Sequence, residues 1–258
     1  MPFTRYKIWA VGEKLGAAGG VVPSCYVGIA GIAKPNTPAM PYTVFNELIS
    51  NRFANLLMLP CPPGFMIEPE GEPYFVSLNF NLSGQDLPPA NPNLIIQNHQ
   101  NLVWGIILFD AWIANADRHN RNISFDTVTN KLHIFDHSHA LLGAGIDPCA
   151  HIKEHENSIK NLERNCLAQN VTSLRGFESQ FRRLNSIPDF FISELLSSPN
   201  EIELGNDITK NLEDFLMQRR SNLAKLILGA KNLFPKIPAK AWKELEPLLL
   251  LEEMTSED

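Results

Sequence analysis

Residues 113–142 read IANADRHNRNISFDTVTNKLHIFDHSHALL, and this stretch carries the strongest signals of both fold and chemistry. Four of the seven histidines of the chain fall within it, and Asp117, Asn122 and Asp136 stand among them. Two kinds of site use such residues: a metal site built from histidines, or a site in which carboxylates hold a hard cation while the histidines brace the loops. The arrangement of the flanking elements distinguishes the two.

The pattern around Asp117 predicts a loop that connects a buried helix to a β-hairpin. Residues 97–114 are apolar at helical spacing and nearly apolar all round, which is typical of a buried helix. The loop NADRHNRN then leads into two short predicted strands, ISF and KLHIF, joined by the turn DTVTN. Because the start of the first strand and the end of the second lie together in a hairpin, we expect Asp117, Asn122 and Asp136 to converge.

Two carboxylates and an amide oxygen are hard ligands, which suit Mg²⁺ with water and phosphate oxygens and suit zinc or copper poorly. A zinc site would need three rigidly held ligands, to which His137 and His139 could contribute. Each acidic residue taken alone is also typical of an ordinary loop or strand end. Their joint order, D-x4-N followed by a carboxylate at a strand end, is what phosphoryl transfer requires. The set therefore favours the carboxylate site.

The composition predicts no general attraction for nucleic acid or for anionic membranes. The chain has 258 residues, a net charge of −6 and 44% hydrophobic residues, enough for one large domain or two smaller lobes. Its four cysteines include no CxxC pair, which argues against a disulfide framework and against structural zinc. The first residues do not resemble a signal peptide, and no apolar run approaches the ~20 residues of a membrane span. We therefore predict a cytoplasmic protein that does not associate with membranes.

Proline, glycine and apolar patterns divide the chain into four segments, for which we predict an α+β fold. Residues 1–78 are expected to form a small β-rich lobe with one helix, residues 79–92 a linker, residues 93–235 a larger helical lobe and residues 236–258 a tail. The apolar segment AWKELEPLLLL of the tail either folds back on the helical lobe, which we favour, or docks a partner protein.

The first lobe is expected to contain five strands, and the second to end in a long amphipathic helix. The predicted strands are residues 6–11, 25–29, 32–34, 66–67 and 74–78, and the predicted helices include residues 44–57, with Thr43 as N-cap, and residues 208–233. Asp110 lies in the buried helix that precedes Asp117. It either pairs with an arginine such as Arg219 or Arg220 or lies exposed on the open side of that helix.

The segments FDAWIANADRHNRN and HIFDHSHALL resemble the catalytic and metal-binding segments of HipA-like kinases. The same block is also similar to phosphatidylinositol 3- and 4-kinases, and both families have the protein-kinase-like fold. The similarity to HipA-like kinases extends through GIAKP, NELISNRFANLLMLPCPP and FLMQRRSNL, and so covers most of residues 15–230. This resemblance implies a bilobal protein-kinase-like fold.

The resemblance also implies a role for each residue of the set. Asp117 would be the catalytic base or the residue that orients the acceptor, and Asn122 and Asp136 would be the Mg²⁺ ligands. Lys34 would be the strand lysine that reaches the phosphates of ATP. His119, inside the catalytic loop, would shape that loop or assist charge at the phosphate.

Four further positions complete the implied nucleotide site. Gly19 and Gly20 belong to a glycine-rich turn whose N–H groups would approach phosphate oxygens, although the turn lacks a G-x-G-x-x-G pattern and also reads as a surface turn. Leu78 and Phe80 would run between the lobes, where backbone groups take the adenine edge and apolar neighbours its face. The metal-binding segment reads Asp-His-Ser where protein kinases have Asp-Phe-Gly.

Glu47 is the expected ion-pair partner of Lys34, because it lies on the helix that follows the lysine strand. It is, however, roughly 200° around that helix from the apolar Phe45, by the ~3.6-residue period. Either the helix is covered on both sides, or the ion pair does not form.

These features predict an ATP- and Mg²⁺-dependent kinase that, like HipA-like serine/threonine kinases, phosphorylates a protein hydroxyl. One alternative is a lipid or small-molecule kinase similar to the phosphatidylinositol kinases. Another is a catalytically weak nucleotide-binding protein that acts as a partner. The expected partners are a protein acceptor and, as the resemblance implies, a small antitoxin-like protein, with no direct contact to nucleic acid.

Overall fold

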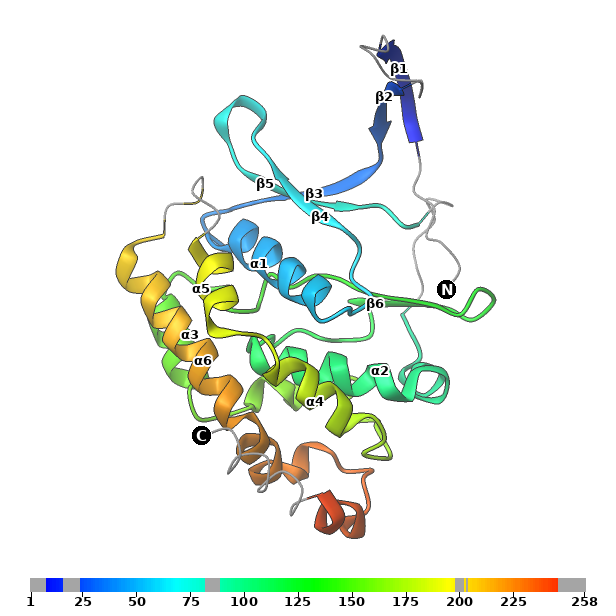
Figure 1. Cartoon of the computed structure of the whole chain (residues 1–258), viewed down its shortest axis with the longest axis vertical. Helices are drawn as coiled ribbons and strands as arrows, with labels where there is room; N and C mark the ends of the chain where they lie inside the picture. Colours follow the sequence, from blue (N-terminus) through cyan, green and yellow to red (C-terminus); the bar gives the residue numbers. More distant parts are fainter. Residues whose placement is uncertain (1–7, 16–23, 82–88, 198–201, 203, 246–258) are drawn as a thin grey trace.

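The computed structural model describes residues 8–15, 24–81, 89–197, 202 and 204–245 (Figure 1). The glycine-rich turn with Gly19 and Gly20 lies outside these residues. The described strands are β1 (Ile8–Leu15), β2 (Ser24–Ile29), β3 (Gly31–Pro35), β4 (Gly64–Ile67), β5 (Tyr74–Leu78), β6 (Ile123–Asp126) and β7 (Lys131–Ile134).

The described helices follow the order α1 (Thr43–Leu56), α2 (Pro92–Trp112), α3 (Pro148–His155), α4 (Phe177–Asn185), α5 (Asp189–Ser197) and α6 (Asn206–Gly229). Short 3-10 turns occur at Pro69–Gly71, Lys160–Arg164 and Lys231–Leu233. The chain is therefore a mixed α and β protein in which most of the strands come before the long helix α2.

The described strands form three small antiparallel sheets. The β1–β2 hairpin projects from one end of the molecule, and the three-stranded sheet, in the order β3-β5-β4, lies beside it and above α1 (Figure 1). In the register of this sheet Lys34 lies opposite Phe75. The β6–β7 hairpin is separate, and helices α2 to α6 fill the other end of the molecule (Figure 1).

Helix α1 is buried on two sides, which explains how a polar face can lie inside the protein. Val44 and Leu48 pack with Phe75 of the overlying sheet. Phe45 and Ile49 belong instead to the main core around α2 and α6. Because both sides of α1 are covered, the helix presents its polar side chains to protein groups rather than to water.

The start of α1 corrects one prediction. The helix begins at Thr43, and its N-cap is Tyr42, whose side chain makes no capping hydrogen bond. The Thr43 hydroxyl donates to the carbonyl of Met40 at 3.0 Å, and the Asn36 side chain accepts from the N–H of Val44 at 2.9 Å. A side chain that lies earlier in the chain thus performs the capping function that we assigned to Thr43.

Helix α2 runs through the main core, and its tryptophan side chains contact the neighbouring helices. Trp104 and Trp112 are fully buried, and Trp112 packs edge-on against Phe53 of α1 with ring centroids 4.8 Å apart. The indole N–H of Trp112 donates to the carbonyl of Leu216 in α6 at 2.9 Å. Helix α2 starts earlier than predicted because Asn91 caps it and Pro92 occupies its first turn, positions that both residues favour.

The described part of the tail folds back on the helices. Ile237, Trp242 and Leu245 are buried in the main core, and Lys236 Nζ lies 2.7 Å from Asn170 Oδ1. This arrangement agrees with the favoured prediction for the segment up to residue 245. Among the described residues, no helix combines the length and apolar character that crossing a membrane requires.

Candidate active site

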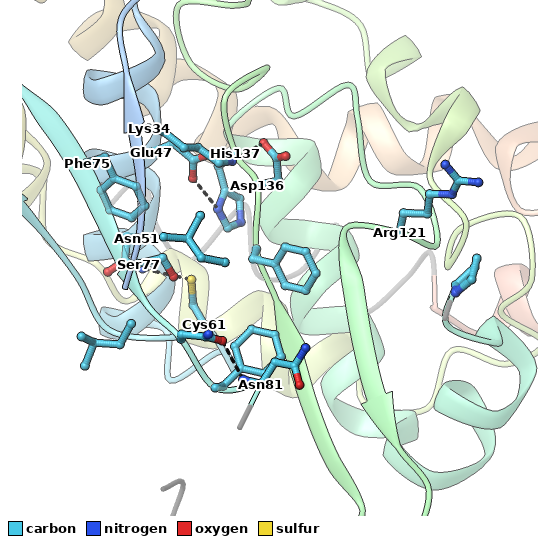
Figure 2. Close-up of a pocket in the computed structure, with 16 residues that line it drawn as sticks. Lys34, Glu47, Asn51, Cys61, Phe75, Ser77, Asn81, Arg121, Asp136 and His137 are labelled. Atoms are coloured by element: carbon cyan, nitrogen blue, oxygen red, sulfur yellow. Dashed lines mark hydrogen bonds and ion pairs between the residues drawn. The ribbon is translucent and has the colours of Figure 1, made fainter. Parts of the chain in front are cut away.

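A cavity of about 780 Å³ lies between the β3–β5–β4 sheet, α1 and the end of β7 (Figure 2). Lys34, Glu47, Asp136 and His137 gather at one end of it. The apolar part of the wall consists of Ile32, Phe75, Leu78, Phe80 and Phe135. The cavity therefore combines a charged end with an aromatic and aliphatic wall.

Lys34 bridges two carboxylates at the charged end. Its Nζ lies 2.5 Å from Glu47 Oε1 and 2.8 Å from Asp136 Oδ1, and the Glu47 side chain is only 2% exposed. The ion pair that the sequence left open is therefore present, because α1 is covered on both sides. It joins the strand lysine to α1 and to the end of β7.

The pKa values of this cluster keep its lysine and its exposed carboxylate charged. Burial lowers the pKa of Lys34, but Glu47 and then Asp136 raise it, and the net shift is upward. Burial likewise raises the pKa of Asp136, but Lys34 and the Ser138 hydroxyl hold it well below its usual range. At neutral pH Asp136 is therefore an anion that can bind a cation.

The β6–β7 hairpin brings Asp136 and Asn122 to the same end, as predicted. Ile123 lies opposite Ile134 in the register, and the N–H of Phe135 donates to the carbonyl of Asn122 at 3.2 Å. Directly after this pairing Asp136 adopts a φ of 62°, in the left-handed region that residues other than glycine rarely occupy. Such strain persists only where the surroundings enforce it, and it is common at functional sites.

Asn122 also organises the loop that precedes the hairpin. Its Nδ2 donates to the carbonyl of Asp117 at 2.7 Å and lies 3.1 Å from Asp117 Oδ2. This orientation turns the amide oxygen, the atom a cation would use, away from Asp117. His119 Nε2 lies 3.7 Å from Asp117 Oδ2, and its Nδ1 accepts from the N–H of Arg121 at 3.1 Å. Asp117, His119 and Asn122 thus form one cluster, which lies beside the cavity and not on its wall.

Arg118 supports this loop from the protein interior, and the sequence did not reveal this structural role. The fully buried guanidinium forms two hydrogen bonds with Asp110, each 3.0 Å long. Its NH1 donates to the carbonyls of Asn122 at 3.0 Å and Phe135 at 2.7 Å. One side chain therefore ties the loop that carries Asp117 to α2 and to the residues that directly precede β6 and directly follow β7.

Asp110 pairs with an arginine of the helical segment, as one of the two alternatives predicted, but the partner is neither Arg219 nor Arg220. Asp110 is fully buried, and its partner is Arg118, from the loop itself. The guanidinium of Arg219 is buried elsewhere and donates to backbone carbonyls, among them Ala111 at 2.6 Å. Arg220 pairs with Asp189.

Two of the histidines contact other side chains at the cavity. His137 is buried with its Nδ1 3.8 Å from Glu47 Oε2, and the His133 ring stacks on Phe80 with centroids 4.1 Å apart. Within the described ranges, no group of three histidine, cysteine, aspartate or glutamate side chains is arranged to hold a metal ion. His139 joins no such group among these residues.

The segment with Leu78 and Phe80 lines the cavity, and two of its backbone N–H groups are hydrogen-bonded within the protein. The N–H of Leu78 donates to the carbonyl of Pro63, and that of Asn79 to the carbonyl of Ala30, each at 2.9 Å. Both donors are therefore occupied. The ring of Phe80 forms part of the cavity wall, and its centroid lies 5.6 Å from that of the Phe135 ring.

Most of the other wall residues were not predicted, among them Asn51, Cys61, Arg121 and Phe135. Phe135 and Arg121 each directly precede a predicted metal ligand, so their neighbours in the sequence could have revealed them. Cys61 is inert as a nucleophile, because burial raises the pKa of its thiol to about 12. No pattern in the sequence connects it to the cavity.

We expect acid to destabilise the protein through histidines that are buried or partly buried. Burial lowers the pKa of five histidines. The pKa of His133 and of His151 falls to about 4, and the pKa values of His99, His137 and His155 are also lowered. Below the unfolded-state pKa of about 6.5 the unfolded chain binds more protons than the folded one, so stability falls as the pH drops from about 7 toward 4. The midpoint of urea unfolding should therefore decrease from pH 7 to pH 5, and less steeply in a His151→Gln variant. A constant midpoint would contradict this expectation.

No family model matches the sequence, and no curated protein matches it either. Among solved structures, the chain is similar to the Helicobacter pylori proinflammatory kinase CtkA, with a TM-score of 0.54 and 14% identity over 87% of this chain and 95% of that one. It also matches HipA from a Shewanella oneidensis MR-1 complex with HipB and operator DNA, with a TM-score of 0.41 and 11% identity over 91% of this chain and 66% of that one. The similarity to CtkA confirms the predicted resemblance to HipA-like kinases at the level of the fold.

Proposed function

We propose that the chain is an ATP- and Mg²⁺-dependent kinase that transfers the γ-phosphate to a protein hydroxyl. One observation carries this proposal: Lys34 pairs with both Glu47 and Asp136 at the charged end of a cavity. The hairpin that supplies Asp136 also supplies Asn122, which is bonded to Asp117. Phosphoryl transfer needs such a set, because its catalysis is mainly positioning and charge stabilisation.

The cavity fits a nucleotide. Its volume of about 780 Å³ lies within the usual range for small-molecule sites, and its wall is largely apolar with a few charged groups. The aromatic rings of Phe80 and Phe135 would cover the faces of a base. Lys34, held by its two carboxylates, would bind phosphate oxygens at the opposite end. Gly19 and Gly20 would approach the same phosphates.

The donor set also fits Mg²⁺. Asp136 is ionised, and Asn122 has its amide oxygen turned away from Asp117, so both offer the hard oxygens that this cation prefers. Bound Mg²⁺ would neutralise charge on the phosphates. Ser138 donates to Asp136 Oδ1 at 2.8 Å and would keep that carboxylate oriented.

Asp117 would orient the acceptor hydroxyl and accept its proton. Its carboxylate is one-third exposed and accepts from Asn122 Nδ2, while its own backbone N–H donates to Asn115 Oδ1. His119, on the outer side of the same carboxylate, would assist charge there. This geometry leaves the acceptor free to arrive from solvent.

We also propose a bilobal division for this kinase. Residues 1–78 would form the nucleotide-binding lobe, residues 79–92 the linker, residues 93–235 the catalytic helical lobe and residues 236–258 an appended tail. The acceptor protein would bind the helical lobe near Asp117. A small antitoxin-like partner stays a prediction of the sequence resemblance.

An assay of phosphate transfer from γ-labelled ATP to proteins of a cell lysate and to the chain itself tests the proposal. The Asp117→Asn variant is expected to lower the transfer rate about 10²-fold, because the side chain can no longer accept the proton. The matched control is Asp207→Asn, an exposed aspartate in the first turn of α6, which should transfer phosphate like the wild type. Wild-type rates in the Asp117→Asn variant, or no Mg²⁺-dependent transfer by the wild type, would refute the proposal.

A further inference from the structure

The side chain of Asn46 in α1 forms hydrogen bonds to the backbone of the segment that follows Asp136. The side chain is fully buried. Its Nδ2 donates to the carbonyls of Ser138 and Gly143, each at 2.9 Å, and its Oδ1 accepts from the N–H of Leu142 at 3.2 Å. The amide is thus satisfied by backbone groups more than ninety residues away in the sequence.

These three hydrogen bonds require an amide of this length at this position. A carboxylate would face two carbonyl oxygens, and an aliphatic side chain would leave two carbonyls and an N–H buried without their partner. Each such group costs about 1–3 kcal/mol when it loses its partner in the interior. The contact is therefore specific to asparagine, and it acts on backbone rather than on the apolar packing of α1.

The next residue along the helix, Glu47, reaches the same segment through side chains. Glu47 pairs with Lys34, Lys34 pairs with Asp136, and Glu47 Oε2 lies 3.8 Å from the Nδ1 of His137. Successive residues of α1 thus hold the backbone after Asp136 and, through the lysine, the Asp136 carboxylate. A shift of α1 would disturb both connections together.

Gly143, at the other end of the segment, is also held in place, because it lies against α3. Gly143 has a φ of 74°, and a Cβ at this position would lie 2.6 Å from His151 Nδ1 of α3. The absence of a side chain therefore lets the backbone run between α3 and α1 and offer its carbonyl to Asn46. Residues 136–143 are held from both sides.

We propose that Asn46 is a positioning residue that keeps α1 and residues 136–143 in one arrangement before any nucleotide binds. The Lys34–Glu47 pair and Asp136 are then assembled permanently, and the kinase needs no movement of α1 to become active. The catalytic part of this inference rests on the proposed function. The structural part, that Asn46 restrains residues 136–143, does not.

Hydrogen exchange of the nucleotide-free protein tests the structural part. In the Asn46→Leu variant the peptides covering residues 43–51 and 136–143 should exchange at least about tenfold faster than in the wild type, because Leu142 loses its acceptor and two carbonyls lose their donor. The control is Leu223→Ala, a buried α6 position with no part in the cavity, compared at the same interval below its own Tm. Equal exchange of residues 136–143 in the two variants, or no change from the wild type, would overturn the inference.

Kinetics of the Asn46→Asp variant test the catalytic part. We expect kcat to fall about 10- to 100-fold at pH 8, as for other residues that orient a ligand of the metal, with a smaller change in KM for ATP. Burial and the two facing carbonyls should raise the pKa of the new carboxyl, whose protonated form can donate again. Its kcat relative to wild type should therefore increase from pH 8 to pH 6, which a loss of general stability would not produce.

The experiments distinguish a failure of the proposed function from a failure of the positioning role of Asn46. If Asp117→Asn and Asp136→Asn transfer phosphate at wild-type rates, the proposed function is wrong, while the exchange experiment still decides whether Asn46 restrains the segment. If those variants are inactive but the folded Asn46→Asp variant keeps wild-type kcat at all pH values, only the positioning role is wrong. If Asn46→Leu does not fold, exchange is measured on Asn46→Asp at pH 8 with the same criteria.

Discussion

The Asp136→Asn variant is expected to lose at least about 10³-fold in the rate of phosphate transfer, because the substitution removes charge at the point where phosphate charge must be balanced. Asp136 is the ionised residue of the proposed metal pair, and it also holds Lys34 Nζ at 2.8 Å. The asparagine keeps the volume and the Ser138 contact but not the negative charge. Single-turnover transfer from γ-labelled ATP, with Mg²⁺ varied, measures the effect.

The same hairpin provides a matched control for this experiment. Asp126 is the exposed last residue of β6, and its carboxylate accepts from the N–H of Val128 at 2.9 Å. It is absent from the wall of the cavity that Asp136 lines. The Asp126→Asn variant should transfer phosphate at the wild-type rate. In addition, the increase in Tm that ATP gives the wild type should require Mg²⁺ and be lost in Asp136→Asn. Transfer within tenfold of wild type in Asp136→Asn would exclude it as the metal ligand.

The Arg118→Met variant is expected to lower the free energy of unfolding by about 3–5 kcal/mol, because it leaves the buried carboxylate of Asp110 without its counter-ion. The two side chains are both fully buried and form a bidentate ion pair. Methionine has comparable length but no donors, so the carbonyls of Asn122 and Phe135 also lose their hydrogen bonds. Urea unfolding followed by circular dichroism measures the change.

An exposed arginine distinguishes this effect from the loss of any arginine. Arg182, whose side chain is 64% exposed, pairs with Glu178 one turn earlier on α4. Such surface pairs contribute about 0–1 kcal/mol, so Arg182→Met should be destabilised by less than 1 kcal/mol or so. If Arg118→Met were equally mild, the support that we assign to the Arg118–Asp110 pair would be wrong. If it does not fold, Asp110→Asn, which keeps the size and one acceptor oxygen but removes the charge, serves for the measurement.

The parts of the fold that the sequence predicted are those with local patterns. The helix–loop–hairpin around Asp117 follows from an apolar helix, a polar loop and two strands of alternating character, and the structure has these elements at β6 and β7. The convergence of Asn122 and the end of β7 followed from hairpin geometry alone. The functional roles of these residues stay predictions, since geometry does not measure catalysis.

The parts that could not be predicted depend on polar partners far apart in the sequence. Asn46 lies on a helix whose apolar period says nothing of the backbone it meets, and Arg118 lies in a loop where an exposed side chain is the ordinary expectation. Glu47 illustrates the same limit. A helical wheel assumes one buried side, whereas α1 is buried on two, so its carboxylate could be inside without belonging to the apolar stripe.

The occupied N–H groups of Leu78 and Asn79 have a consequence for inhibitor design. Many compounds that compete with ATP are built around acceptors aimed at free main-chain donors between the two lobes of a kinase. In the proposed nucleotide site, the N–H groups of Leu78 and Asn79 already donate to the carbonyls of Pro63 and Ala30, so a scaffold aimed at either of these two donors would have to displace that contact. Selective chemistry for this cavity should instead exploit aromatic stacking with Phe80 and Phe135 and a direct contact with Lys34.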